Sequence, residues 1–276
     1  MKVRFQNSPK ETSQMNTQEL RDNFLVQGLM KEGTIQLVYS HFDRLIIGGV
    51  VPTSAAIVLP NEEELKAKFF LERREMGIIN IGGKGTVHAD GVDYVIEKLE
   101  CVYLGKGTKE VSFTSVDAAN PAMFYVLSLP AHHEYPNKMM TKAEASPVHL
   151  GDISTSNKRT IYKYIHNDGI QSCQLVMGLT TLEAGSVWNS VPPHTHTRRM
   201  EAYFYFDVDP AHRVMHFMGE PQETRHLVIA NNEAAIAAPW SMHFGVGTAC
   251  YGFIWGMAGE NKEFTDMDPV PVATLK

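Results

Sequence analysis

The residues best suited to chemistry lie in the segment PPHTHTRRME, residues 192–201. His194 and His196 are two positions apart, so on an extended strand their side chains point to the same face. Glu201 follows five positions later, an odd step that requires a turn or bulge before its carboxylate can rejoin that face. A third histidine, His243, lies in the later segment APWSMHFGVG. Three imidazoles and one carboxylate predict a mononuclear metal site.

The donor types narrow the choice of metal. Imidazole and carboxylate ligands suit zinc, iron, manganese or nickel. Thiolate ligands are not expected, because the three cysteines (Cys101, Cys173 and Cys250) are far apart and form no CxxC pair. We interpret them as free thiols in a reducing compartment.

The segments around these residues have the texture of an all-β protein. From about residue 34 onward, short runs rich in Val, Ile, Tyr and Phe are broken by Gly, Pro, Asn and Asp. Many short strands with frequent turns are typical of a sandwich or barrel rather than of βαβ units. We also expect a short N-terminal helix with Thr17 as its cap, and a short helix or charged loop over residues 61–68.

A faint internal repeat divides the chain into two halves. ERREMGIINI (72–81) and TRRMEAYFYF (197–206) both place two arginines before a strand, at an offset of 197 − 72 = 125 residues. A polar stretch containing several prolines separates the halves. The predicted organisation is a degenerate barrel without metal over 1–135, a linker over 136–160 and a metal-binding barrel over 161–276.

The repeat also serves as an internal control for the metal site. At the same offset, Phe69, Leu71 and Met76 take the places of the first three ligands. Aligning GKGTK (105–109) with PWSMH (239–243) puts Lys109 in the place of His243. None of these residues matches the ligand that it replaces. We therefore expect one metal site per chain, in the C-terminal half.

Composition excludes several function classes. The 276 residues are 43% hydrophobic and 20% charged, enough apolar material for a sizeable core, and the net charge is −6. A negative chain has no general attraction to nucleic acid or to an anionic membrane. No apolar leader and no run of about 18 apolar residues occurs. We expect a soluble cytoplasmic protein.

The spacing HxH-x4-E, followed by a histidine about 40 residues later, is the metal signature of cupins, small antiparallel barrels with the metal in the barrel mouth. The chain further resembles the 5-keto-4-deoxyuronate isomerase family. The resemblance is carried by VYSHFDRLIIGGVVP (38–52), FFLERREMGIINIGGKGTV (69–87), VYLGKGTKEV (102–111), HTHTRRMEAYFYF (194–206), GEPQETRHLVI (219–229) and GFIWGMAGEN (252–261). Together with the repeat, it implies an all-β bicupin of two antiparallel, jelly-roll-like barrels with a few short helices.

This resemblance implies a zinc-dependent ketol isomerase of pectin and uronate breakdown. Its reaction would interconvert 5-dehydro-4-deoxy-D-glucuronate and 3-deoxy-D-glycero-2,5-hexodiulosonate through an enediolate whose negative charge a divalent cation stabilises. The zinc ligands carry over to His194, His196, Glu201 and His243, although manganese and iron suit the same ligand types. The family also implies a homo-oligomer, commonly a hexamer.

The sequence offers only candidates for the proton shuttle and for the substrate contacts. A proton shuttle should exist, and His226 and Glu223 are candidates by chemistry and by their position near strand ends. The substrate carries a carboxylate, so an arginine contact is expected, with Arg225 and Arg199 as candidates. Tyr205 shares strand parity with Glu201 and is a candidate substrate contact.

Two other functions fit the metal ligands. One is an Fe(II) cupin dioxygenase, which would contain iron and take up oxygen. The other is a non-catalytic sugar-binding cupin. A DNA-binding regulator is not favoured, because the chain has no helix-turn-helix pattern and no basic stretch. Metal content and oxygen dependence distinguish these functions from the isomerase.

Overall fold

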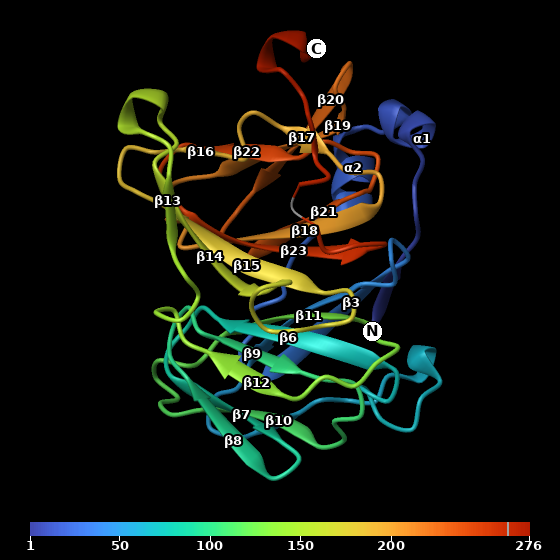
Figure 1. Ribbon diagram of the computed structural model, residues 1–276, viewed down its shortest axis with the longest axis vertical. Coiled ribbons are helices and arrows are strands. Elements are labelled where there is room, and N and C mark those ends of the chain that lie inside the picture. Colours follow the sequence, from blue (N-terminus) through green and yellow to red (C-terminus); the bar gives the residue numbers. More distant parts are fainter. Residues whose placement is uncertain (264) are drawn as a thin grey trace. The chain divides into compact units, whose positions relative to one another are not determined.

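The computed structural model describes residues 1–263 and 265–276, which form a mostly β structure with a few short helices (Figure 1). The residues group into two compact units. Unit one comprises residues 1–4, 28–146 and 163–177, and unit two comprises residues 5–27, 147–162 and 178–276. Residues 5–27 therefore pack in unit two although they precede most of unit one in the sequence. The predicted ranges 1–135 and 161–276 group them differently.

Unit one contains two sheets, ordered β1-β3-β4-β11-β6-β9-β12 and β5-β10-β7-β8. Their bounds are β1 (Lys2–Arg4), β3 (Thr34–Ser40), β4 (Ile46–Val51), β5 (Ile57–Val58), β6 (Arg74–Asn80), β7 (Gly85–Ala89), β8 (Val92–Ile96), β9 (Cys101–Leu104), β10 (Val111–Ser115), β11 (Phe124–Pro130) and β12 (Lys138–Met140). Apolar side chains from both sheets share one core, which includes Met76, Phe113 and Phe124.

Unit two repeats this pattern. Its sheets are ordered β13-β14-β15-β23-β18-β21-β2 and β16-β22-β19-β20, with a small additional β17-β24 pair. The bounds are β2 (Leu25–Val26), β13 (Val148–Leu150), β14 (Arg159–Ile165), β15 (Val176–Leu182), β16 (Trp188–Asn189), β17 (His194–Thr195), β18 (Arg199–Phe206), β19 (Val214–Glu220), β20 (Glu223–Ile229), β21 (Glu233–Ala237), β22 (Phe244–Gly247), β23 (Gly252–Gly259) and β24 (Asp268–Pro269). The division between the units falls within β14 and β15.

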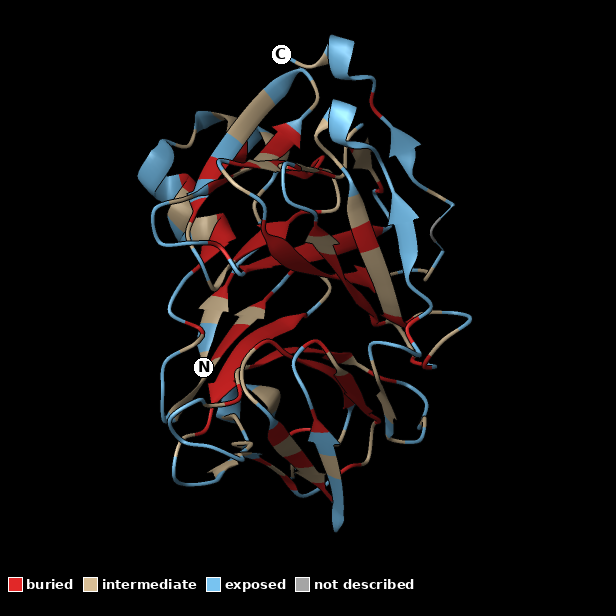
Figure 2. Cartoon of the chain, turned by 90° about the vertical axis from the view of Figure 1, so that its left-hand side faces the viewer, coloured by how far each residue is buried: buried red, intermediate tan, exposed pale blue. Residues whose placement is uncertain are grey.

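Strand β18 is the central element of unit two. It pairs with β21 on one side and with β23 on the other, and all of its residues are buried. Figure 2 shows that buried positions follow the strands of the large sheets. Because side chains alternate along a strand, Glu201, Tyr203 and Tyr205 share one face of β18. A strand fixed on both sides gives these side chains a rigid base.

The helices are short, and their caps explain where they begin. They are α1 (Pro9–Gln14), α2 (Thr17–Phe24), η1 (Glu63–Leu65), η2 (Ile153–Thr155) and η3 (Val272–Thr274). The predicted N-terminal helix is present as α2, but its cap is Asn16 rather than Thr17, because the Asn16 side chain accepts the backbone N–H groups of Gln18 and Glu19. A capping box of Ser8 and Glu11 starts α1, which the sequence analysis did not predict.

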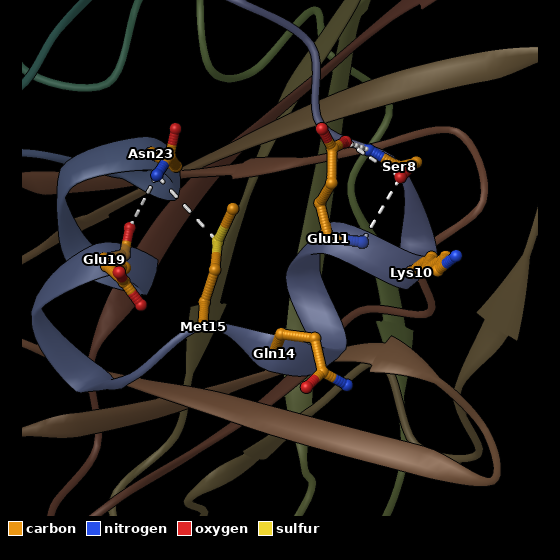
Figure 3. A pocket seen from close by; sticks show the side chains of 7 residues that line it. All are labelled: Ser8, Lys10, Glu11, Gln14, Met15, Glu19 and Asn23. Atoms are coloured by element: carbon orange, nitrogen blue, oxygen red, sulfur yellow. Dashed lines mark hydrogen bonds between the residues drawn. The ribbon is translucent and has the colours of Figure 1, made fainter.

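These two helices line a surface pocket (Figure 3). Several of its polar groups serve the helices themselves, since Glu11 bonds Ser8 and the Asn23 amide donates to the Glu19 carbonyl. The pocket shows no converging set of metal or acid–base donors. Its polar groups therefore stabilise the two helices and do not form a candidate site.

The predicted all-β class is confirmed, while barrel closure is not. Each sheet of the described residues has two edge strands, and none closes on itself. The predicted short helix or loop over 61–68 holds η1, and the stretch predicted as a linker holds β12, β13 and η2. Across the described residues, no helix has the length and apolar character needed to cross a bilayer.

Candidate metal centre

The HxH segment and Glu201 come together through a turn. His194 lies on β17, and Glu201 lies on β18, which begins at Arg199. Between them the backbone N–H of Arg199 donates to the carbonyl of His196 over 3.0 Å, which closes a tight turn. This is the turn that the five-residue step required. It brings the carboxylate back to the imidazoles.

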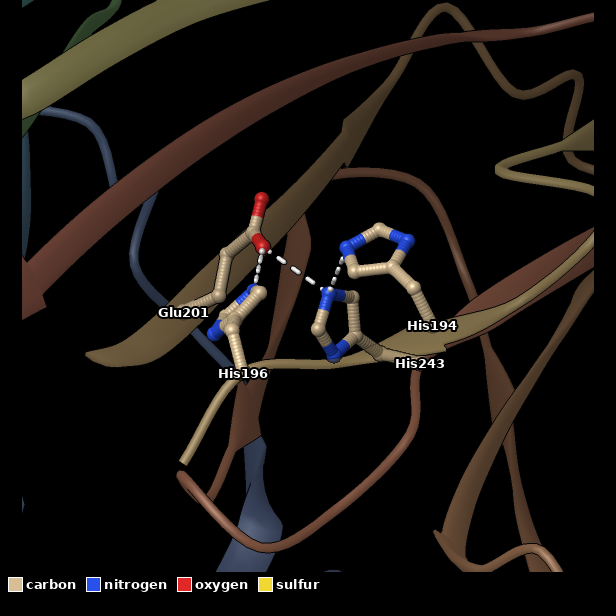
Figure 4. Close-up of side chains that lie close together, drawn as sticks. All are labelled: His194, His196, Glu201 and His243. Atoms are coloured by element: carbon tan, nitrogen blue, oxygen red, sulfur yellow. Dashed lines mark hydrogen bonds and ion pairs between the residues drawn. The ribbon is translucent and has the colours of Figure 1, made fainter. Parts of the chain in front are cut away.

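His243 completes the group from the segment just before β22 (Figure 4). Its Nε2 lies 2.9 Å from Oε2 of Glu201 and 3.1 Å from Nε2 of His194. Nε2 of His196 lies 3.2 Å from the same Glu201 oxygen. All four donor atoms are within 4.8 Å of one another, so the structure brings the predicted ligands together.

Backbone carbonyls orient two of the imidazoles. Nδ1 of His196 donates to the carbonyl of Arg199 over 2.9 Å, and Nδ1 of His243 donates to the carbonyl of Ser241 over 3.2 Å. With Nδ1 donating to a carbonyl, Nε2 of each ring faces the cluster, where it can donate to Glu201 when protonated and bind a cation when not. Ser241 is itself held, since its hydroxyl accepts the N–H of Gly219 over 2.8 Å.

The electrostatics of the group favour a bound cation. Burial would raise the pKa of Glu201, but the charge of His243 and the hydrogen bonds from the two imidazoles hold it well below its ordinary value. Burial, followed by the charge of His243, lowers the pKa of His194 from 6.5 to about 3. Burial would likewise lower the pKa of His196, but its hydrogen bond to Glu201 raises it instead. The site therefore has a permanent anion beside a neutral imidazole.

The geometry fits a four-coordinate divalent metal. Zinc binds histidine nitrogen and carboxylate oxygen at about 2.0–2.2 Å, which places tetrahedral ligand atoms about 3.3 Å apart. The contacts of 2.9–3.2 Å in the cluster are close to that spacing. All four donor atoms lie within 4.8 Å of one another, so small shifts of these side chains would accommodate the ion. Imidazole and carboxylate donors do not by themselves select zinc over manganese or iron.

Arg199 and Tyr205, both predicted substrate contacts, are fully buried and already have partners. The Arg199 guanidinium bonds Asp266 over 2.5 Å and also bonds the carbonyl of Glu263. The Tyr205 hydroxyl lies 2.8 Å from Nδ1 of His216. Burial raises the pKa of Tyr205 well above its ordinary value, so its hydroxyl stays protonated. Neither side chain exposes a polar group to a substrate.

The remaining candidates lie on β20, and the structure does not bring them to the metal ligands. His226 is exposed and pairs across the ladder with Phe217, whereas the next residue of β19 in register, His216, pairs with Leu227. Since neighbouring residues alternate between faces, His226 faces away from His216 and from Tyr205, which His216 contacts. The structure does not bring His226 to the four predicted ligands, and its catalytic role stays a prediction.

Glu223 and Arg225 are engaged near the start of the same strand. They form an ion pair with each other over 2.5 Å, and Arg225 also donates to the carbonyl of Ser13. Glu223 is exposed. No contact of the described residues links either side chain to the four ligands, so the geometry does not support the expected catalytic or substrate role.

His216 is a further polar residue of this region, and nothing in the sequence indicates a function for it. It is fully buried, its Nδ1 meets Tyr205, and its Nε2 has no hydrogen-bond partner among the described residues. Burial, reinforced by the charge of His243, lowers its pKa from 6.5 to about 3. The only available signal was alternation in the segment VMHFMG, which places His216 on the same face as Val214 and Met218. An isolated histidine on an apolar face gave no reason to expect a polar cluster.

Comparison with known proteins gives consistent matches over the whole chain. The sequence model of the KduI/IolB family matches residues 24–270. The chain is 54% identical, over 276 residues and all of both chains, to the 4-deoxy-L-threo-5-hexosulose-uronate ketol-isomerase of Shouchella clausii (strain KSM-K16). It is 52% identical, over 278 residues and all of both chains, to the protein of the same name in Yersinia pseudotuberculosis serotype O:1b (strain IP 31758).

Solved structures with low sequence identity share the fold. An IolB-like protein from Salmonella typhimurium LT2 superposes with a TM-score of 0.70 at 17% identity, covering 90% of this chain and 97% of that one. A structure of oxalate decarboxylase superposes with a TM-score of 0.60 at 10% identity, covering 89% of this chain and 79% of that one. At such identities the likeness concerns the fold alone.

Proposed function

The chain belongs to the KduI/IolB family, and we propose that it is a ketol isomerase acting on 4-deoxy-L-threo-5-hexosulose uronate, as its relatives are named. The product would be 3-deoxy-D-glycero-2,5-hexodiulosonate, which places the enzyme in uronate and pectin breakdown. The observation that carries the proposal is the convergence of His194, His196, Glu201 and His243 in a chain similar to these isomerases over its full length.

The metal in this proposal is zinc, held by those four side chains. When bound, it would act as a Lewis acid toward the negative charge that builds on the substrate oxygen as the carbonyl moves from C1 to C2. Three neutral imidazoles and one carboxylate leave a formal charge of +1 on the centre. Because the chain would supply four ligands, catalysis would require the ion also to accept a substrate oxygen.

The residues around the centre keep it rigid and screened from water. Glu201 and Tyr203 project from the same face of β18, whose backbone is bonded on both edges. The ring of Tyr203 lies 5.4 Å from that of His243 and stacks on Phe253 at 5.3 Å. Preorganised groups in a water-excluded site stabilise developing charge without having to reorganise during the reaction.

The Tyr203 hydroxyl is the polar group of this wall. It lies 3.1 Å from the hydroxyl of Ser190, a partly exposed residue with a φ of 49° in the left-handed region. Burial raises the pKa of Tyr203 well above its ordinary value, so the hydroxyl remains a hydrogen-bond donor. It can orient a substrate oxygen beside the metal ligands.

The proposal includes the organisation of the chain. Residues 1–135 would form a cupin-like barrel without metal, residues 136–160 a linker and residues 161–276 the metal-binding barrel, so that one zinc is bound per chain. Support comes from the matching seven- and four-stranded sheets in both units. We further propose a cytoplasmic homo-oligomer, commonly a hexamer in this family, that acts on a small keto-uronate.

The test combines elemental analysis with turnover on the purified ketouronate. We expect one zinc per chain, activity without oxygen, and loss of both zinc and turnover in His243→Ala. His212→Ala, a change in a partly exposed histidine of the same unit, is the matched control. A zinc-loaded protein without isomerase turnover would refute the activity, and iron with oxygen uptake would favour a dioxygenase.

A further inference from the structure

A buried arginine lies directly beside the metal ligands and binds a segment near the C-terminus. Arg199 is completely buried, and its guanidinium donates to Asp266 over 2.5 Å, to Asn261 over 3.3 Å and to the carbonyl of Glu263. The Asn261 amide in turn donates to the second oxygen of Asp266 over 2.7 Å. The arginine and the carboxylate thus form a closed hydrogen-bonded unit with Asn261.

The same C-terminal residues pair with the segment that carries the histidines. We call residues 260–263 and 266–270 the strap. Strand β24 of the strap is antiparallel to β17, with Pro269 opposite His194 and Asp268 opposite Thr195. The N–H of Val270 donates to the Pro193 carbonyl over 2.8 Å, and the N–H of Glu260 donates to the Arg198 carbonyl over 2.9 Å. The strap is therefore bonded to the ligand segment at both of its ends.

Arg199 also acts on a ligand through its backbone. Its carbonyl accepts Nδ1 of His196 over 2.9 Å, and its N–H closes the turn onto the His196 carbonyl. One residue thus orients His196 with its main chain and holds the strap with its side chain. A shift of the strap would reach both histidines, through β17 for His194 and through this turn for His196.

We propose that Arg199 is a positioning residue that fastens the strap to residues 193–199, and that the Arg199–Asp266 ion pair determines how tightly the metal is held. Outer groups that orient metal ligands typically contribute about 10- to 100-fold in metal affinity. The proposal rests on the four-ligand metal centre of the proposed function, and it assigns Arg199 no contact with substrate.

Arg74 is the counterpart of Arg199 in unit one, and it shows what such an arginine contacts where the four predicted metal ligands are absent. Arg74 begins β6 as Arg199 begins β18, and it is also buried. Its guanidinium bonds the hydroxyl and carbonyl of Ser128 and the carbonyl of Arg44, and it forms no ion pair with a carboxylate among the described residues. The unit with the metal ligands is the one in which the arginine holds a charged segment.

The experiment measures zinc affinity by chelator competition in Asp266→Asn and Arg199→Lys. Asparagine keeps the shape of Asp266 and an oxygen that accepts from the buried Arg199 guanidinium, and Asp266 is itself 20% exposed. We expect zinc binding to weaken by about 10- to 100-fold in both variants. Amide hydrogen exchange should rise in the strap, and kcat at saturating zinc should change little. Arg74→Lys is the matched control and should lower Tm without changing zinc affinity.

The outcomes separate the strap from the activity. Wild-type zinc affinity in Asp266→Asn together with faster exchange in its strap would refute the coupling to the metal. Unchanged exchange would refute the fastening itself. If Arg74→Lys weakens zinc as much as Arg199→Lys does, the effect is general destabilisation and the proposal fails. A wild-type protein that binds no zinc would instead overturn the metal centre, and one that binds zinc without turnover would overturn only the isomerase.

Discussion

Strands β6 and β18 occupy the same place in the two units, but the side chains that they place in the interior differ in polarity. Each is fifth in its seven-stranded sheet, is fully buried and begins at a buried arginine. Two residues after the arginine, β6 carries Met76, which packs in the apolar core of unit one, and β18 carries Glu201, which joins three imidazoles. The same backbone frame supports either an apolar core or a cluster of three imidazoles and a carboxylate.

The difference is confined to side chains at a few positions. Next on the same face, β6 has Ile78, and β18 has Tyr203, whose ring packs near His243. Lys109, aligned with His243, is exposed. An apolar interior gains stability from burial alone, whereas a buried carboxylate requires partners that satisfy its charge. The shared backbone therefore determines where these side chains lie, and the residue types determine what they can bind.

The substitution Glu201→Met gives β18 the residue that β6 carries at the same place. In Glu201→Met we expect metal content to fall to background and turnover to fall by roughly 1,000-fold or more, because a Lewis-acid cation contributes several kcal/mol. Elemental analysis and steady-state kinetics measure the two effects. Glu220→Met, at an exposed glutamate of the same unit, should leave both unchanged. Full zinc occupancy in Glu201→Met would remove the carboxylate from the ligand set.

The reverse exchange tests whether unit one can accept a charge. Met76→Glu buries a carboxylate among apolar side chains without imidazole partners, and we expect the free energy of unfolding to fall by about 3–5 kcal/mol. Zinc should remain at one per chain. Denaturant titration and elemental analysis check these outcomes, with Thr114→Glu as the exposed control. A second bound metal would show that the frame alone can assemble a site.

Acid should destabilise the two units unequally. Burial lowers the pKa values of His194 and His216 from 6.5 to about 3, so in metal-free protein the unfolded chain binds more protons between these values. Stability is therefore lost as pH falls below about 6.5. The raised pKa of His196 opposes this change in part. No histidine of unit one is buried.

Amide hydrogen exchange at pH 7 and pH 5 measures the protection of the backbone in each unit separately. We expect protection to fall more in unit two, and zinc to restore it. An equal fall in both units would contradict the assignment of the acid-sensitive histidines. Zinc binding itself should weaken with acid, because a proton on His196 competes with the metal.

The sequence was sufficient for the features that depend on local spacing and failed where distant segments meet. The HxH step and the odd interval to Glu201 predicted a turn before the carboxylate rejoins the histidines, because strand parity is a local property, and the structure contains that turn. The partners of Arg199 could not be foreseen, because Asp266 lies in another strand-to-strand connection and no spacing rule relates the two. The same limit misplaced His226, since its face depends on the register between β19 and β20.

Substitution of His226 should have the least effect on activity, because this residue lies on the outer face of the β19–β20 pair. Its ring is exposed and lies on the same face of the strand pair as Phe217, with the two ring centroids 6.4 Å apart. His216, which contacts the Tyr205 hydroxyl, lies on the opposite face. A surface substitution of this kind changes free energies by about 0.5 kcal/mol or less, roughly a twofold effect on kcat/KM. We therefore expect His226→Gln to retain wild-type kinetics and zinc content. Removal of a true proton shuttle would lower the rate by about 100- to 10,000-fold. A loss of that size, with zinc retained and the pH–rate profile altered, would return His226 to the chemistry and require a second face of this sheet to reach the substrate.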